Sequence, residues 1–190
     1  MKRTCRLALV CVALGLTFGS RSLAQKPDAP RFEDYPADVW AGKAVLLNLR
    51  SHPLARTFRT RLREDMKTEG INFAGHYTFA TVGCGAGCSI NSIIDARTGR
   101  AYFPKALSGW TAIVGDFERS EEFEQQTRAD SRLLRMLGRP NIGRMNQERY
   151  GPSGIYYYEW IHNRLRLVKF VHVGSYPNAD PADQIVDAGD

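Results

Sequence analysis

The stretch HYTFATVGCGAGCSINSIID, residues 76–95, gives the clearest indication of the fold. Two runs rich in aromatic and β-branched residues, His76–Val82 and Ser89–Asp95, flank a segment of glycines and cysteines. Such runs are typical of β-strands, and a short glycine-containing connection between two of them is typical of a hairpin. The sequence therefore predicts two neighbouring strands joined by residues 83–88.

Two cysteines, Cys84 and Cys88, lie within this connection, and Gly83, Gly85 and Gly87 surround them. Glycine allows the backbone to fold so tightly that two Cα atoms approach within about 7 Å, the limit for a disulfide. A ring this small adds only about 2 kcal/mol of stability by the chain-entropy argument. We therefore expect a Cys84–Cys88 disulfide that shapes the loop more than it stabilises the whole fold.

Three other uses of these cysteines compete with the disulfide. A redox centre normally has two residues between its cysteines, whereas three separate Cys84 from Cys88. A zinc site needs two further ligands besides the cysteines. His76 is one candidate, but the sequence has no second pair of Cys or His residues at ligand spacing. A Cys–His nucleophile needs a free thiolate, which a neighbouring cysteine would remove in an oxidising compartment. We expect neither a metal nor a cofactor.

Before this hairpin, residues 51–70 read SHPLARTFRTRLREDMKTEG, which predicts an amphipathic helix. Ser51 or His52 is suited to cap it, proline is tolerated in the first turn, and Gly70 can end it. The apolar residues recur every four positions and predict the buried stripe: Leu54, Phe58, Leu62 and Met66. The basic residues fall on the opposite side and predict an exposed face: Arg56, Arg59, Arg63 and Lys67.

After the hairpin the sequence predicts further strands, at Arg100–Phe103, Thr111–Val114, Arg132–Leu137, Ile155–Trp160 and Arg164–Val173. Tight turns are expected at residues 96–99, where Gly99 supplies a positive φ, and at residues 162–163. Residues 117–128 fit either a helix or a strand. The expected fold class is therefore α+β, with one N-terminal amphipathic helix packed on a mostly antiparallel sheet of about six strands.

The first 24 residues differ from the rest of the chain. Lys2, Arg3 and Arg6 precede an apolar run, and Ser22-Leu23-Ala24 provides the small residues that a signal peptidase recognises. We expect a signal peptide over residues 1–24 with cleavage near Ala24, and a periplasmic or secreted product. Residues 25–190 would then form a single domain that begins with a loose leader over residues 25–34.

Removal of residues 1–24 lowers the net charge of the chain, because this segment contains four basic and no acidic residues. The net charge falls from +6 for the whole chain to +2 for the expected mature product. Bulk charge then no longer favours nucleic acid as a partner. No other segment is long and apolar enough to cross a bilayer, so we expect no membrane insertion after cleavage.

Six motifs carry a resemblance to a known group of proteins: Ser51-His-Pro, Asn72-Phe-Ala-Gly-His-Tyr, Gly83-Cys-Gly-Ala-Gly-Cys, Ile94-Asp-Ala-Arg-Thr-Gly, Asp130-Ser-Arg-Leu-Leu and Tyr156-Tyr-Tyr-Glu-Trp. With these motifs the chain resembles a family of small exported bacterial proteins of unknown function. In layout alone it is also similar to periplasmic lysozyme inhibitors of the Ivy type, which present a disulfide-closed loop between strands. The first resemblance implies export but no activity.

The sequence contains no recognisable nucleophile–base pair, phosphate-binding loop or metal-binding motif. We therefore expect a non-catalytic binding protein of the cell envelope, whose partner is an envelope protein or a glycan. The candidate binding residues are the loop and its flanks: His76, Tyr77, Gly83, Gly85, Gly87 and Ser89. The alternative is a small periplasmic hydrolase in which His76 acts with Asp95 or another carboxylate as general acid and base.

Overall fold

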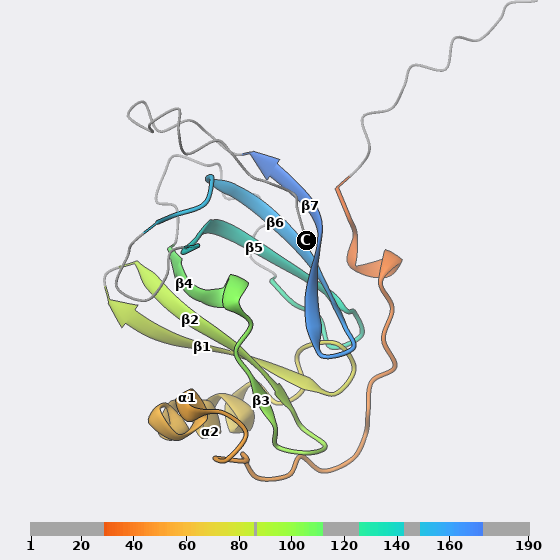
Figure 1. Cartoon of the computed structure of the whole chain (residues 1–190). Coiled ribbons are helices and arrows are strands. Elements are labelled where there is room, and N and C mark those ends of the chain that lie inside the picture. The colour runs from red at the N-terminus through yellow and green to blue at the C-terminus, as the bar shows by residue number, and fades with distance from the viewer. Residues whose placement is uncertain (1–28, 86, 112–125, 143–148, 173–190) are drawn as a thin grey trace, which may run out of the picture.

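The structure is a computed structural model that describes residues 29–85, 87–111, 126–142 and 149–172 (Figure 1). The expected signal peptide, residues 1–24, lies outside the described residues. So do residues 25–28 of the expected leader, residues 112–114 of one expected strand, and residues 117–125 of the segment that fits either a helix or a strand. The predictions for these residues stay predictions.

The described residues form a seven-stranded antiparallel sheet with a few short helices. The strands follow the order β1-β2-β4-β5-β6-β7, and β3 pairs with β2 beside β4. This confirms a mostly antiparallel sheet and is consistent with the α+β class. The bounds are β1 Tyr77–Gly85, β2 Cys88–Asp95, β3 Ala101–Tyr102, β4 Ser108–Thr111, β5 Leu133–Pro140, β6 Gly154–Ile161 and β7 Arg164–His172.

The predicted helix is present as two consecutive short helices, α1 (Pro53–Thr57) and α2 (Arg59–Thr68). Phe58 separates them because its backbone, with φ −98° and ψ 20°, leaves the helical region. Of the two expected caps, His52 caps α1, since its Nδ1 accepts the backbone N–H of Leu54 at 3.2 Å. Leu62 of α2 is fully buried against β1 and β2, as the apolar stripe predicts.

Side chains of β6 alternate between two apolar clusters. Tyr156, Tyr158 and Trp160 point into a central cluster that also receives residues from β1, β2, β4 and β5. Because strands from both halves of the sheet contribute to this cluster, the sheet curves around it (Figure 1). Ile155 and Tyr157 point the other way, into a smaller cluster on the outer face.

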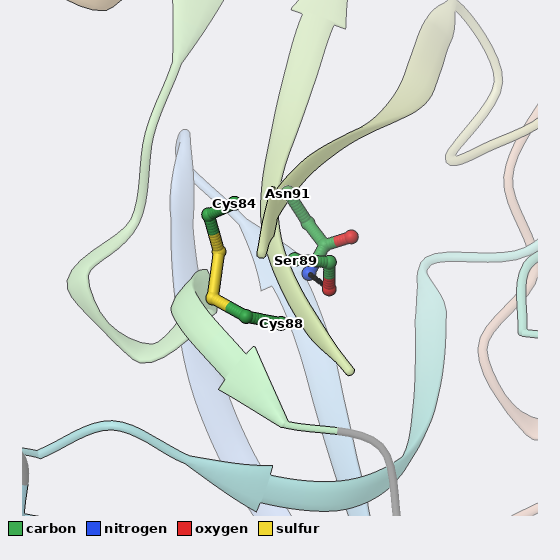
Figure 2. The surroundings of a disulfide bond; sticks show 4 residues. All are labelled: Cys84, Cys88, Ser89 and Asn91. Atoms are coloured by element: carbon green, nitrogen blue, oxygen red, sulfur yellow. Dashed lines mark hydrogen bonds between the residues drawn. A yellow bond between two sulfur atoms is a disulfide. The ribbon is translucent and has the colours of Figure 1, made fainter. Parts of the chain in front are cut away.

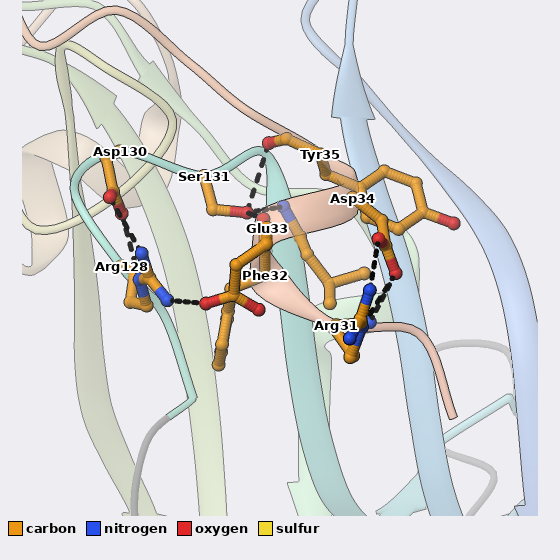
Figure 3. A network of polar contacts seen from close by, with 9 residues as sticks. Arg31, Phe32, Glu33, Asp34, Tyr35, Arg128, Asp130 and Ser131 are labelled. Carbon is orange, nitrogen blue, oxygen red and sulfur yellow. Dashed lines mark hydrogen bonds and ion pairs between the residues drawn. The ribbon is translucent and has the colours of Figure 1, made fainter. Parts of the chain in front are cut away.

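The outer cluster is covered by residues that the sequence assigns to a loose leader. Phe32–Asp34 forms a short 3-10 helix, η1, and Phe32 is buried against Leu133, Ile155 and Tyr157. Figure 3 shows how polar contacts hold this segment in place. The Ser131 hydroxyl donates to the Phe32 carbonyl at 2.7 Å, and Arg128 pairs with Glu33. Residues 32–34 are therefore part of the folded domain.

Candidate functional site

The predicted binding residues lie at the two ends of one strand. His76 precedes β1 directly and Tyr77 begins it, whereas Gly83 and Gly85 lie at its far end. A strand rises about 3.3 Å per residue, so the positions from His76 to Gly83 span about 23 Å. The structure therefore brings Gly83, Gly85, Gly87 and Ser89 together, but it separates His76 and Tyr77 from them.

The loop between β1 and β2 is closed by the predicted disulfide, with 5.1 Å between the Cα atoms of Cys84 and Cys88 (Figure 2). Gly85 and Gly87 have φ values of 140° and 69°, which side chains with a Cβ rarely tolerate. Both residues and Gly83 are exposed, and a Cβ placed on any of the three would meet no atom within 4 Å. The loop therefore projects from the end of the sheet.

The base of the loop is held on one side by β4. Cys88 pairs with Thr111 and Ser89 pairs with Trp110. Trp110 is only 3% exposed, and its Nε1 donates to the Leu137 carbonyl of β5 at 3.0 Å. The loop is thus connected directly to the central core.

A short chain of polar side chains continues beneath the loop. The Thr81 hydroxyl donates to Asn91 Oδ1 at 2.9 Å, and Asn91 Nδ2 donates to Ser89 Oγ at 3.2 Å. Figure 2 shows Asn91 and Ser89 close to the disulfide. Asn91 is only 1% exposed, whereas Thr81 is exposed and Ser89 is half-buried, so the chain runs from a buried amide to the surface on both sides. Sequence reasoning missed Thr81 and Asn91; the available signal was that these two polar residues face each other once the two strands pair.

At the other end of β1, the His76 imidazole packs on the Tyr77 ring with 4.2 Å between ring centroids. Its Nε2 lies 3.9 Å from Asp95 Oδ1, which is too far for a hydrogen bond. Burial lowers the pKa of His76, and this outweighs the opposite effect of Asp95. The neutral imidazole is therefore favoured at this position.

Asp95 is already engaged in the turn that follows β2. Its Oδ1 accepts the backbone N–H of Arg97 at 2.8 Å, and its Oδ2 accepts the Thr98 hydroxyl at 2.9 Å. Aspartate commonly stabilises turns in this way. Tyr77 is also engaged, because its hydroxyl donates to Asn163 Oδ1 at 2.9 Å. His76, Asp95 and Tyr77 therefore each have a contact partner within the fold.

Within the described ranges, no three His, Cys, Asp or Glu side chains gather in a way that would hold a metal ion. None of the helices in those ranges is long and apolar enough to span a membrane. Comparison of the chain with protein-family models, with curated proteins and with solved structures finds no match.

Proposed function

We propose that this is an exported, non-catalytic binding protein of the cell envelope that inserts its disulfide-closed loop, residues 83–88, into a concave surface of a protein partner. The observation that carries the proposal is the open space around Gly83, Gly85 and Gly87. A loop that projects from the sheet and lacks side chains at these positions is narrow, so a partner can approach its backbone closely.

Preorganisation supports this function. The disulfide and the pairing of Cys88 and Ser89 with β4 restrict the loop before any partner arrives. A loop that is already ordered loses less conformational entropy on binding, so more of the contact free energy appears as affinity. Recognition loops on a rigid sheet are common for this reason.

The alternative, a hydrolase that uses His76 with Asp95, has less support from the geometry. The two side chains are 3.9 Å apart, and both Asp95 carboxylate oxygens accept hydrogen bonds from the turn. A general base needs its partner within about 3 Å, although contacts can tighten when substrate binds. The binding function therefore fits the described residues better.

The test is affinity capture from cell-envelope extract, with the retained proteins quantified by mass spectrometry. Gly83→Gln places a side chain in open space at a position without a positive φ, so it changes the loop surface and leaves the fold intact. Arg63→Gln, an exposed change on α2, is the matched control. We expect the wild type and Arg63→Gln to retain the same protein, and Gly83→Gln to retain at least about tenfold less of it.

Two results would contradict the proposal. One is that the wild type retains no protein above the level of an unrelated control. The other is that Gly83→Gln retains the same proteins in the same amounts as the wild type.

A further inference from the structure

A second site lies at the opposite end of the sheet from the disulfide loop. Three segments enclose an open cleft of about 430 Å³: residues 51–52 before α1, residues 100–106 around β3, and residues 163–165 at the β6–β7 turn. Figure 1 shows β3 between the start of α1 and this turn. Ligand pockets for small molecules commonly measure about 300–1,000 Å³. The cleft therefore has the size for a small ligand.

All of the charged residues that line the cleft are basic. Arg100, Lys105 and Arg164 line it, and no Asp or Glu does. Within the part of the chain that the structure describes, none of these three side chains forms a salt bridge. Three cations around one cleft repel one another, and an anionic ligand would relieve that repulsion.

Neutral side chains add two further features. Tyr102 and Phe103 are half-buried in the cleft wall, and the Arg100 guanidinium lies 5.4 Å from the centre of the Tyr102 ring. The His52 ring stacks on Phe103, with 4.7 Å between centroids. Since His52 Nδ1 accepts a backbone N–H, the neutral ring carries its proton on Nε2 and has a donor left for a ligand.

We infer that this cleft binds a small anionic ring compound of monosaccharide size, with a phosphate or carboxylate group held by Lys105, Arg100 and Arg164. Its ring lies against one of the two aromatic side chains, because Tyr102 packs toward the central cluster and Phe103 toward the cluster beneath the helices. Guanidinium and ammonium groups bind both kinds of anion by charge-assisted hydrogen bonds. The site is separate from the protein-binding loop, so it is independent of the function proposed above.

Isothermal titration with three probes tests the inference: glucose 6-phosphate, glucuronate and glucose. We expect saturable binding of at least one anionic sugar, weakened by about 1 M NaCl because salt screens the attraction, and no binding of glucose. If only glucose 6-phosphate or only glucuronate binds, the result supports the site and identifies the preferred anionic group. If neither anionic sugar binds, or if glucose binds equally well, the inference is wrong.

A matched pair of variants locates the binding. Lys105→Gln/Arg164→Gln removes two exposed charges from the cleft, and we expect affinity to fall at least about tenfold. Arg63→Gln/Lys67→Gln removes the same two kinds of charge from the exposed face of α2, and affinity should change by less than about twofold. Equal losses in both variants would show attraction to net charge only and would overturn the site.

Discussion

Gly138 of β5 shows how much one residue can matter in this fold. It has a φ of 145°, and an added Cβ would lie 2.2 Å from Trp110 Nε1 and 2.4 Å from the Thr111 carbonyl. We expect Gly138→Ala to lower the free energy of unfolding by about 3 kcal/mol, because β4 must move away from β5. Urea unfolding measures this.

Gly83→Ala is the comparison for Gly138→Ala. An added Cβ there meets no atom within 4 Å, and its φ is not positive. Gly83→Ala should therefore change the free energy of unfolding by less than about 1 kcal/mol. A loss for Gly83→Ala as large as that for Gly138→Ala would contradict the open space described around Gly83.

At the scale of elements, β1 is an edge strand whose outer side is covered by side chains. Asn72 accepts the Phe79 N–H at 2.7 Å and donates to the Phe79 carbonyl at 3.3 Å, as a neighbouring strand would. Farther along β1, the Asp65 carboxylate accepts the Thr81 N–H at 3.3 Å. These contacts satisfy backbone groups that would otherwise attract a strand from another molecule.

Asn72→Ala removes both hydrogen bonds to Phe79, so the backbone N–H and C=O of Phe79 lose these partners. We expect the free energy of unfolding to fall by about 1–3 kcal/mol and the protein to self-associate more readily. Urea unfolding and light scattering are the measurements, and Asn48→Ala in the loop before α1 is a control that leaves the sheet edge unchanged. If Asn72→Ala unfolds and scatters like the wild type, Asn72 does not protect the edge.

At the scale of the whole molecule, stability should depend on pH through His76. Burial holds the pKa of its imidazole below the ordinary value of 6.5, which it regains on unfolding. The unfolded chain therefore binds more protons at acid pH, and the free energy of unfolding falls as the pH drops below about 6.5. Between pH 7.5 and pH 5, the wild type should lose more in Tm than His76→Gln. An equal or larger loss for His76→Gln would show that His76 is not responsible.

The sequence predicts those features of the molecule that depend on residues close together along the chain. The β1–β2 hairpin and its disulfide follow from local signals: alternating strand residues, glycines and the cysteine spacing. The separation of His76 from the loop also follows from the rise of a strand, once residues 76–82 are assigned as one.

Features that depend on distant pairing could not be predicted in this way. Trp110 supports the loop only because β4 lies between β2 and β5, and Phe32 is buried only because η1 covers the outer face of β5 and β6. The cleft near Arg100 and Arg164 joins residues more than sixty positions apart. No local pattern in the chain indicates such contacts.

The proposed function rests on the claim that the closed loop itself recognises the partner. The most direct measurement is the dissociation constant of the captured partner for the wild type and for Cys84→Ser/Cys88→Ser. The disulfide adds only about 2 kcal/mol to stability, so the variant should stay folded, while the affinity falls at least about tenfold because the loop is no longer preorganised. Lys105→Gln/Arg164→Gln, at the other end of the sheet, should bind like the wild type. An unchanged affinity for the folded cysteine variant, or a loss confined to the cleft variant, would contradict the claim.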